Sequence, residues 1–197
     1  MQFVFNSLQE PHEYVGKHGA GEYPDAPGKC PHKDCGIPVV MSKNGYYRRY
    51  IITRVFAGRI RIRRYKCLKC GHTVSMLPSF CLPYYTYGVE IIVCLMVLAI
   101  GANSKRKAAK ERNDATECIS RRHVALYLSR LRRNRRFIQY GCRQISPGEA
   151  AINGSLGDIE WTKEFLTGNR PTLCPEFNAE FHSTMGKSFM STQNRIA

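Results

Sequence analysis

Two pairs of closely spaced cysteines constrain this chain more than any other feature: Cys30 with Cys35, and Cys67 with Cys70. Thiolates are soft ligands that suit a tetrahedral zinc ion, and two short loops can present four sulfurs from the ends of a folded hairpin. His32 lies between the first two cysteines and is an alternative ligand to one of them. The spacing therefore predicts a zinc site that stabilises a small sheet, because metal binding and folding are thermodynamically coupled.

The remaining cysteines and the start of the chain bear on the compartment. Nine cysteines is an odd number, and the chain opens without the basic start, apolar run and cleavage site of a secretory signal. In a reducing compartment, paired cysteines are metal ligands more often than disulfides. We therefore expect a cytoplasmic protein. The apolar run at 91–102 is too short to cross a membrane and predicts a buried helix, so no membrane partner is expected.

The pattern of strands and helices predicts an α+β protein. A small β-hairpin zinc ribbon is expected at 28–83, followed by an all-α helix-turn-helix domain at 84–145. Residues 1–27 lack periodicity and predict a flexible N-terminal arm. Residues 146–197 predict a poorly structured C-terminal tail with one short helix.

Within the ribbon, Asn44-Gly45 and Ala57-Gly58 predict two hairpin turns. In the run RIRIRRY, Ile60 and Ile62 alternate with arginines, so that one face of the strand packs and the other is cationic. The arginines of this face that we expect to contact nucleic acid are Arg59, Arg61 and Arg63.

Three helices are predicted at 85–100, 105–112 and 121–138, with Ser104 and Ser120 as N-caps of the second and third. The third helix separates apolar from basic residues by its 3.6-residue period. Its inward stripe consists of Val124, Tyr127, Leu128 and Leu131, and its outward stripe of Arg122, Ala125, Ser129, Arg132, Arg133 and Arg136.

The distribution of charge indicates the class of partner. The formal net charge is +15, and the segment from Cys35 to Val89 holds no Asp or Glu while it contains ten Lys or Arg. A second basic block runs from Lys105 to Arg136. An acid-free segment of this length is not explained by an ordinary solvated surface of mixed sign, and it predicts a nucleic-acid partner.

The segment RRYKCLKCGHTVSMLP resembles the zinc ribbon in the N-terminal DNA-binding region of bacterial insertion-sequence transposases. The chain also resembles an uncharacterised transposase-like zinc-ribbon family, in which a Pro-Tyr segment like LPYYTYG follows the ribbon. The likeness covers about residues 28–140. The first pair departs from it, because CPHKDC stands where CPxC is commoner.

The helical part, KRKAAKERN and ISRRHVALYLSRLRRN, is similar to the helix-turn-helix of the same proteins. In that motif the second helix enters the major groove of DNA with its N-terminal residues at base edges. The resemblance implies contacts with bases or phosphates near the start of this helix, and with phosphates further along. The first group is Arg121, Arg122 and His123, and the second is Arg132, Arg133, Arg135 and Arg136.

These features together predict a zinc-dependent DNA-binding protein of mobile-element type, acting as an accessory factor, a regulator or a truncated transposase fragment. A transposase catalytic subunit is then a second expected partner. A catalytic domain with two metal ions takes well over a hundred residues, and only fifty-three follow Gln144. We therefore expect no enzymatic activity, and no catalytic residue is assigned.

Two alternatives stay open. An RNA-binding or ribosome-associated ribbon protein would stack unpaired bases on Tyr46, Tyr47, Tyr50 and Tyr65. A homodimer through the apolar helix at 91–100 is compatible with either nucleic-acid partner.

Overall fold

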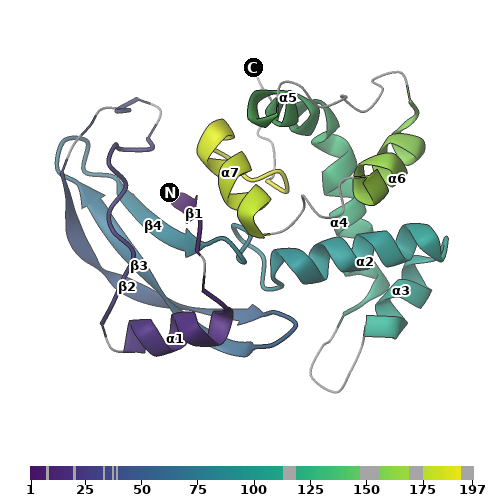
Figure 1. Ribbon diagram of the computed structural model, residues 1–197, viewed down its shortest axis with the longest axis horizontal. Helices are drawn as coiled ribbons and strands as arrows, with labels where there is room; N and C mark the ends of the chain where they lie inside the picture. Colours follow the sequence, from purple (N-terminus) through teal and green to yellow (C-terminus); the bar gives the residue numbers. More distant parts are fainter. Residues whose placement is uncertain are drawn as a thin grey trace.

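A four-stranded sheet lies beside a group of helices in the computed structural model (Figure 1). The structure describes residues 1–7, 9–19, 21–32, 34–36, 38, 40–112, 119–146, 156–168 and 175–191. The elements in chain order are β1 (Gln2–Phe5), α1 (Pro11–Gly19), β2 (Met41–Ile52), β3 (Ala57–Cys67), β4 (Thr73–Pro78), α2 (Val89–Gly101), α3 (Lys105–Arg112), α4 (Arg121–Arg133), α5 (Arg135–Ile145), α6 (Asp158–Gly168) and α7 (Pro175–Met185). The predicted α+β class is confirmed.

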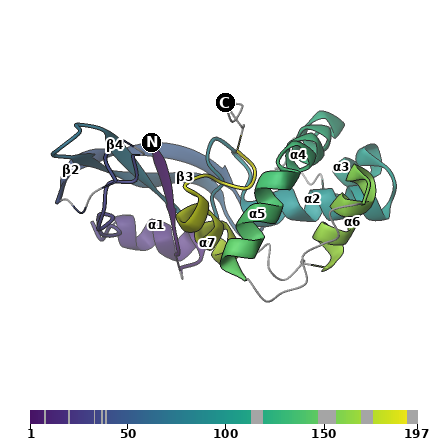
Figure 2. The same ribbon diagram turned by 90° about the horizontal axis from the view of Figure 1, so that it is seen from above.

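The sheet has the order β1-β4-β3-β2. Strands β2, β3 and β4 are antiparallel neighbours, whereas β1 pairs parallel to β4, from Gln2 opposite Ser75 to Phe5 opposite Pro78. The N-terminal segment is therefore part of the fold, and the prediction of a flexible arm at 1–27 is wrong for β1 and α1. Helix α1 lies against one face of the sheet (Figure 2) and buries Tyr14, whose hydroxyl donates to the Arg61 carbonyl at 3.1 Å.

The first predicted hairpin turn is a β-bulge inside β2. Asn44 and Gly45 lie within the strand, and the register with β3 shifts between Lys43 and Tyr46. Gly45 has a φ of +68°, in the left-handed region that glycine tolerates. The Asn44 side-chain amide donates to Thr73 Oγ1 at 3.1 Å, which ties the bulge to β4. The hairpin prediction fails because Asn-Gly suits a left-handed residue in a bulge as well as in a tight turn.

The turn between β2 and β3 lies at 53–56, where the Thr53 N–H donates to the Phe56 carbonyl at 2.7 Å. It therefore precedes Ala57-Gly58, which already belong to β3. The strand RIRIRRY is confirmed as part of β3, with Ile60 and Ile62 buried.

The bulge decides which side chains share a face of the sheet. Beyond it, Tyr47 lies opposite Ile62 and Arg49 opposite Ile60, so these residues belong to the face covered by α1. Directly paired residues point to the same side of a sheet. The opposite face therefore carries the pairs Tyr46 with Arg63, Arg48 with Arg61, and Tyr50 with Arg59.

Two of the predicted helices are confirmed as α2 and α3. Helix α2 is a buried helix, as predicted, because Ile91, Ile92, Leu95 and Met96 lie in the core of their own chain. Among the described residues, no helix is long and apolar enough to cross a membrane. The Ser104 hydroxyl accepts the Lys107 N–H at 3.2 Å, as an N-cap of α3 should.

The third predicted helix is divided at Asn134 into α4 and α5. The Asn134 side chain is buried, and its amide donates to the carbonyls of Phe189 and Ser191 at 2.7 and 2.8 Å. Asn134 at the break thus contacts the C-terminal segment. The periodicity of the helix sequence does not reveal this distant contact. The inward stripe of α4 is confirmed: its buried members are Val124, Tyr127, Leu128 and Leu131.

The prediction of a poorly structured tail is wrong for 156–168 and 175–191, because both segments complete the helical core. Helix α6, near the predicted short helix, buries Trp161 and Phe165, and α7 buries Phe181. Helix α7 also contacts β1 of the sheet, and its Asn178 amide donates to the carbonyls of Ser79 and Cys81, just after β4, at 2.7 and 2.9 Å.

Replacing one buried tail residue tests this packing. Phe165→Ala removes a ring that is stacked on Trp161 at 5.0 Å and should lower the free energy of unfolding by about 3–5 kcal/mol. The matched control Ile159→Ala, at a position 67% exposed in the same helix, should change it by less than about 0.5 kcal/mol. Urea denaturation followed by circular dichroism measures both. Equal, small effects would mean that α6 does not pack on the core.

Candidate metal centre and cationic surfaces

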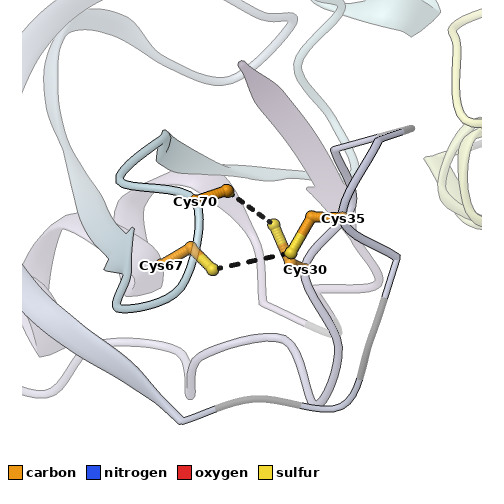
Figure 3. A group of neighbouring side chains, drawn as sticks. All are labelled: Cys30, Cys35, Cys67 and Cys70. Carbon is orange, nitrogen blue, oxygen red and sulfur yellow. Dashed lines mark hydrogen bonds between the residues drawn. The ribbon is translucent and has the colours of Figure 1, made fainter.

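Four cysteine sulfurs converge at the end of the sheet (Figure 3). The Sγ atoms of Cys30, Cys35, Cys67 and Cys70 all lie within 4.8 Å of one another. Cys30 Sγ is 3.7 Å from Cys70 Sγ, and Cys35 Sγ is 3.9 Å from Cys67 Sγ. A tetrahedral ion bound at about 2.3 Å by four sulfurs would hold them about 3.8 Å apart. The donor set and its spacing therefore fit a metal ion.

Each cysteine pair lies on a tight loop that ends in a glycine with positive φ. In the second loop, the N–H of Gly71 (φ +72°) donates to the Cys67 carbonyl at 3.0 Å. In the first, the N–H of Gly36 (φ +55°) donates to the His32 carbonyl, also at 3.0 Å. The wider spacing of CPHKDC is thus accommodated without losing the convergence of its two sulfurs.

Backbone N–H groups also point at the sulfurs. Hydrogen bonds from the backbone of Cys70 and then Lys69 lower the pKa of the Cys67 thiol against the effect of burial. For Cys30, burial raises the pKa, and a backbone hydrogen bond from His32 acts in the opposite direction. The loops therefore supply hydrogen-bond donors to the thiolates. Burial still disfavours the negative charge of the thiolates, and a bound cation would offset that desolvation free energy.

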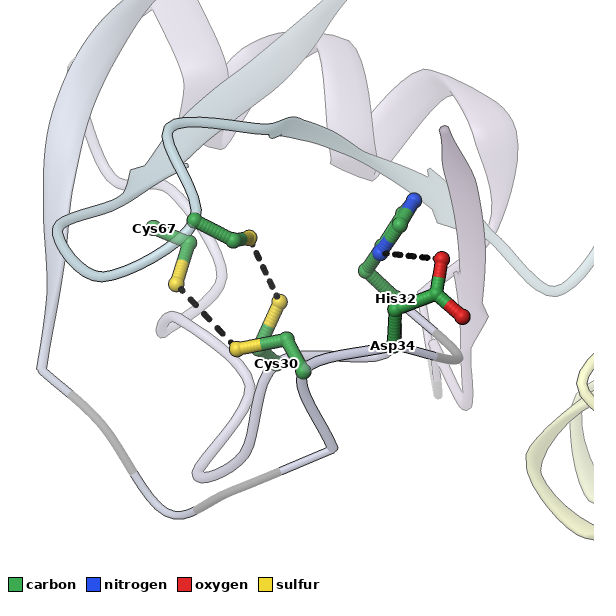
Figure 4. A network of polar contacts seen from close by, with 6 residues as sticks. Cys30, His32, Asp34 and Cys67 are labelled. Carbon is green, nitrogen blue, oxygen red and sulfur yellow. Dashed lines mark hydrogen bonds and ion pairs between the residues drawn. The ribbon is translucent and has the colours of Figure 1, made fainter.

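His32 is not part of the cluster. Its imidazole stacks on His72, with ring centroids 3.8 Å apart, and its Nδ1 lies 3.9 Å from an Asp34 carboxylate oxygen. Figure 4 shows His32 and Asp34 to one side of the sulfurs. The structure thus favours four cysteines over a set in which His32 replaces one of them.

The sheet holds the cluster in place through a small core on the same face. Cys30 and Cys67 are buried with Met41, Tyr65 and Met76 in one apolar group. The Tyr65 hydroxyl donates to the Pro24 carbonyl at 2.5 Å, which brings the segment before the first cysteine onto the sheet. Strand β3 therefore carries both a cluster cysteine and, further along the same face, the predicted arginines.

Of these arginines, Arg59 is exposed, and Arg61 and Arg63 are half-buried. The Arg61 guanidinium lies over the Tyr46 ring at 5.1 Å, and that of Arg63 over Tyr23 at 5.0 Å. Arg48, which was not among the predicted contact residues, is exposed opposite Arg61. Arg48 is two residues from both Tyr46 and Tyr50, so the three side chains share one face of β2. The sequence shows that this face is the arginine-bearing one only when the bulge is taken into account.

The four tyrosines of the RNA-binding alternative do not lie together. Tyr46 and Tyr50 are exposed on the arginine-bearing face. Tyr65 is buried, and Tyr47 is half-buried against the opposite face.

Arg121 and Arg122 are exposed at the first turn of α4, and Arg133 of α4 and Arg136 of α5 are exposed on either side of the break. His123 is engaged at the helix start, where its Nδ1 accepts the Ser120 N–H at 3.1 Å. Arg135, grouped with the phosphate contacts by resemblance, instead pairs with Asp158 at 3.1 Å.

A surface hollow lies between α3, α4 and the start of α6. It is lined by Lys105, Ala125, Leu128, Ser129, Arg132, Arg133 and Asp158. The separation of α3 from α4 departs from a helix-turn-helix, because residues 113–120 stand where that motif has a turn of three or four residues. Of this connection, 113–118 lie outside the described residues.

The site thus defines an α+β protein in which a four-cysteine cluster anchors a cationic sheet beside a helical core. Residues 30–123 match a family described as a domain of unknown function, DUF6431. The match begins at the first cluster cysteine and ends in the first turn of α4. Comparison with curated proteins gave no match, and comparison with solved structures gave none either.

Removing one sulfur tests the metal centre. Cys67→Ser should abolish stoichiometric zinc binding, because three sulfurs and a hydroxyl no longer offer the tetrahedral thiolate set. Cys94→Ser, which changes a half-buried cysteine of α2 outside the cluster, is the matched control and should retain one zinc per chain. Metal content after dialysis, measured by mass spectrometry, gives the result. Unchanged zinc in the Cys67 variant would contradict the assignment.

Acid should release the metal. Binding requires thiolates, so each thiol that is protonated in the free protein must lose its proton. Burial raises the pKa of the Cys30 thiol, which leaves that thiol protonated at neutral pH in the metal-free chain. The dissociation constant for zinc should therefore rise by at least about tenfold per pH unit as pH falls from 8 to 6. Competition with a chromophoric chelator measures it, and a constant independent of pH would argue against thiolate ligation.

Proposed function

We propose that the chain is a zinc-stabilised DNA-binding protein of mobile-element type without catalytic activity of its own. The observation that carries this proposal is a surplus of unneutralised arginine on two surfaces. Among the described residues, Arg135 is the one arginine that forms a salt bridge with a carboxylate. The arginines of the β2–β3 face and of α4 are exposed or half-buried, and none of them has such a partner among the described residues.

The physical argument is electrostatic. Crowding like charges on one face destabilises a folded protein through self-repulsion, and a polyanion relieves it. DNA carries one negative charge per about 1.7 Å of helix axis, and its neutralisation releases condensed counterions. Zinc acts structurally in this proposal, because it would fix the sheet end from which the arginine-bearing strand β3 extends.

The α3–α4 surface supplies the duplex contact in this proposal. Arg121 and Arg122 project from the first turn of α4, where the recognition helix of related motifs meets base edges. Lys105, Arg132 and Arg133 surround the hollow between the helices, and Arg132 carries a buried Nε atom without a hydrogen-bond partner in the structure. A backbone phosphate in the hollow would be met by the guanidinium of Arg132 and its neighbours Lys105 and Arg133. Asp158 at the rim is already paired with Arg135.

The proposed role is that of an accessory factor, a regulator or the DNA-binding part of a truncated transposase. Strand cleavage would come from a separate catalytic subunit. Incubation with element-end DNA and Mg²⁺ should leave the DNA intact, and nicking by the purified chain would contradict a non-catalytic role. Competition between duplex DNA and single-stranded RNA in one gel-shift experiment separates this proposal from an RNA-binding protein.

Duplex affinity should fall steeply with salt. Each neutralised phosphate contributes a slope of about −0.9 in log K against log salt. With about five phosphates, affinity should drop several hundredfold between 50 and 200 mM salt. Arg132→Gln/Arg133→Gln should weaken binding and make this slope shallower by about 2 units. Fluorescence anisotropy with a labelled duplex measures both quantities.

The matched control for this charge change is Lys163→Gln/Lys187→Gln, which removes the same two charges from exposed positions on and beyond the tail helices. Its slope should stay close to that of the unmodified chain. An isotherm that is flat from low to high salt would overturn the proposal. Equal losses in both double variants would show that net charge alone, and not the α3–α4 surface, governs binding.

A further inference from the structure

We propose that the exposed face of β2 and β3 binds an unpaired nucleic-acid strand by stacking its bases on Tyr46 and Tyr50. This tyrosine–arginine face consists of Tyr46, Arg48, Tyr50, Arg59 and Arg61. The inference rests on the proposed function only in taking nucleic acid as the partner. It adds a second substrate class, unpaired bases, and places it on different residues from the duplex contact.

Both rings are partly exposed, and the Arg61 guanidinium lies over the Tyr46 ring at 5.1 Å, where a stacking base would displace it. Tyr46 is 44% exposed and Tyr50 is 49% exposed, whereas Tyr47 between them points to the opposite, packed face. Positions four apart in one strand lie about 13 Å from each other, on the same side of the sheet. A strand laid along β2 therefore meets two aromatic platforms in succession, with Arg48 between them.

The cations lie where the phosphates of such a strand would pass. Arg48 is paired with Arg61, and Tyr50 with Arg59, on the neighbouring strand. None of these three arginines forms a salt bridge within the described part of the chain. Proteins that bind single strands generally stack the bases on aromatic side chains and contact the phosphate backbone with cationic ones.

One end of the face is already closed by the chain itself. Tyr23 stacks on Tyr46, with ring centroids 6.3 Å apart, and the Arg63 guanidinium lies over the rings of both Tyr23 and Tyr65. These contacts fill the end nearest the sulfur cluster. The open part therefore runs from the exposed side of Tyr46 toward Tyr50 and Arg59, away from the four cysteines.

The rings distinguish an unpaired strand from other polyanions. In a duplex the faces of the bases are stacked within the helix, so a sheet face can reach only phosphates and base edges. An acidic peptide would neutralise the arginines but would offer no π-faces for Tyr46 and Tyr50. A strand with unpaired bases contacts both kinds of side chain. Its phosphates neutralise the arginines, and its bases stack on the tyrosine rings, because every base has a face that can stack.

Three labelled 12-mers test the inference with the full, zinc-loaded chain: dT12, rU12 and an abasic deoxyribose-phosphate strand of the same length. The abasic strand keeps the phosphates and lacks the bases. In fluorescence anisotropy, dT12 should bind at least about tenfold more tightly than the abasic strand. rU12 should also exceed the abasic strand, and its ratio to dT12 shows whether the sugar contributes.

Tyr46→Ala/Tyr50→Ala should weaken dT12 binding by about tenfold or more and leave the abasic strand and duplex DNA nearly unchanged. Tyr46→Phe/Tyr50→Phe keeps the rings and should retain dT12 binding. Tyr140→Ala, which removes a ring 57% exposed on α5, is the matched control and should have no effect. Zinc content verifies that each variant keeps its sheet.

Equal affinity of the unmodified chain for dT12 and the abasic strand would overturn the inference, whatever the alanine variant does. Loss of dT12 binding in the phenylalanine variant would also overturn it, because stacking does not need the hydroxyl. If these results occur while duplex binding keeps its steep salt dependence, the proposed function stands without this addition. If duplex binding is insensitive to salt while the tyrosines still govern dT12 binding, the duplex proposal fails alone.

Discussion

The convergence of four sulfurs is the constraint on which the sheet half of the molecule depends. The cluster joins the loop of Cys30 and Cys35 to Cys67 at the end of β3 and to Cys70 in the β3–β4 connection. The apolar core on this face is small, with Met41, Tyr65, Val74 and Met76 as its other buried members. Structural zinc sites contribute on the order of 10 kcal/mol to the folding of small domains. A bound ion would therefore hold together a part of the sheet that burial alone supports weakly.

The bulge at Asn44 and Gly45 has the next largest consequence, because strands have a side-chain period of two. Slipping the register by one residue moves every later side chain of β2 to the other face. In an unbulged β2, continuing the pairing of Lys43 with Tyr65 would place Ile51 among the arginines and Tyr50 in the core. The extra residue instead sends Ile51 to the packed face and Tyr46 and Tyr50 to the cationic one. One glycine in a left-handed conformation thus produces the face that we propose for unpaired bases.

The sequence predicted those parts of the structure that depend on local spacing. The four cysteines, the alternation of Ile60 and Ile62 with arginines, and the inward stripe of α4 are all found where residue patterns place them. The bulge was beyond reach because Asn-Gly has the same local chemistry in a hairpin and in a bulge. The parallel pairing of β1 with β4 joins residues more than seventy positions apart, and no local pattern encodes such a pairing. The helix break at Asn134 similarly depends on carbonyls of the distant C-terminal segment.

Helix α7 explains why the C-terminal segment belongs to the functional architecture. It lies between the sheet and the helical core (Figure 1). Asn178 donates to carbonyls of the β4–α2 connection, and His182 Nδ1 accepts the Val4 N–H of β1 at 3.5 Å. Burial lowers the pKa of His182 to about 4, so the imidazole is neutral at physiological pH and its Nδ1 can remain an acceptor. The same helix packs Phe181 against Phe137 of α5. The tyrosine–arginine face and the α3–α4 surface are therefore carried by parts of one packed structure, so a nucleic acid that engages both surfaces would meet cations already set in position before binding.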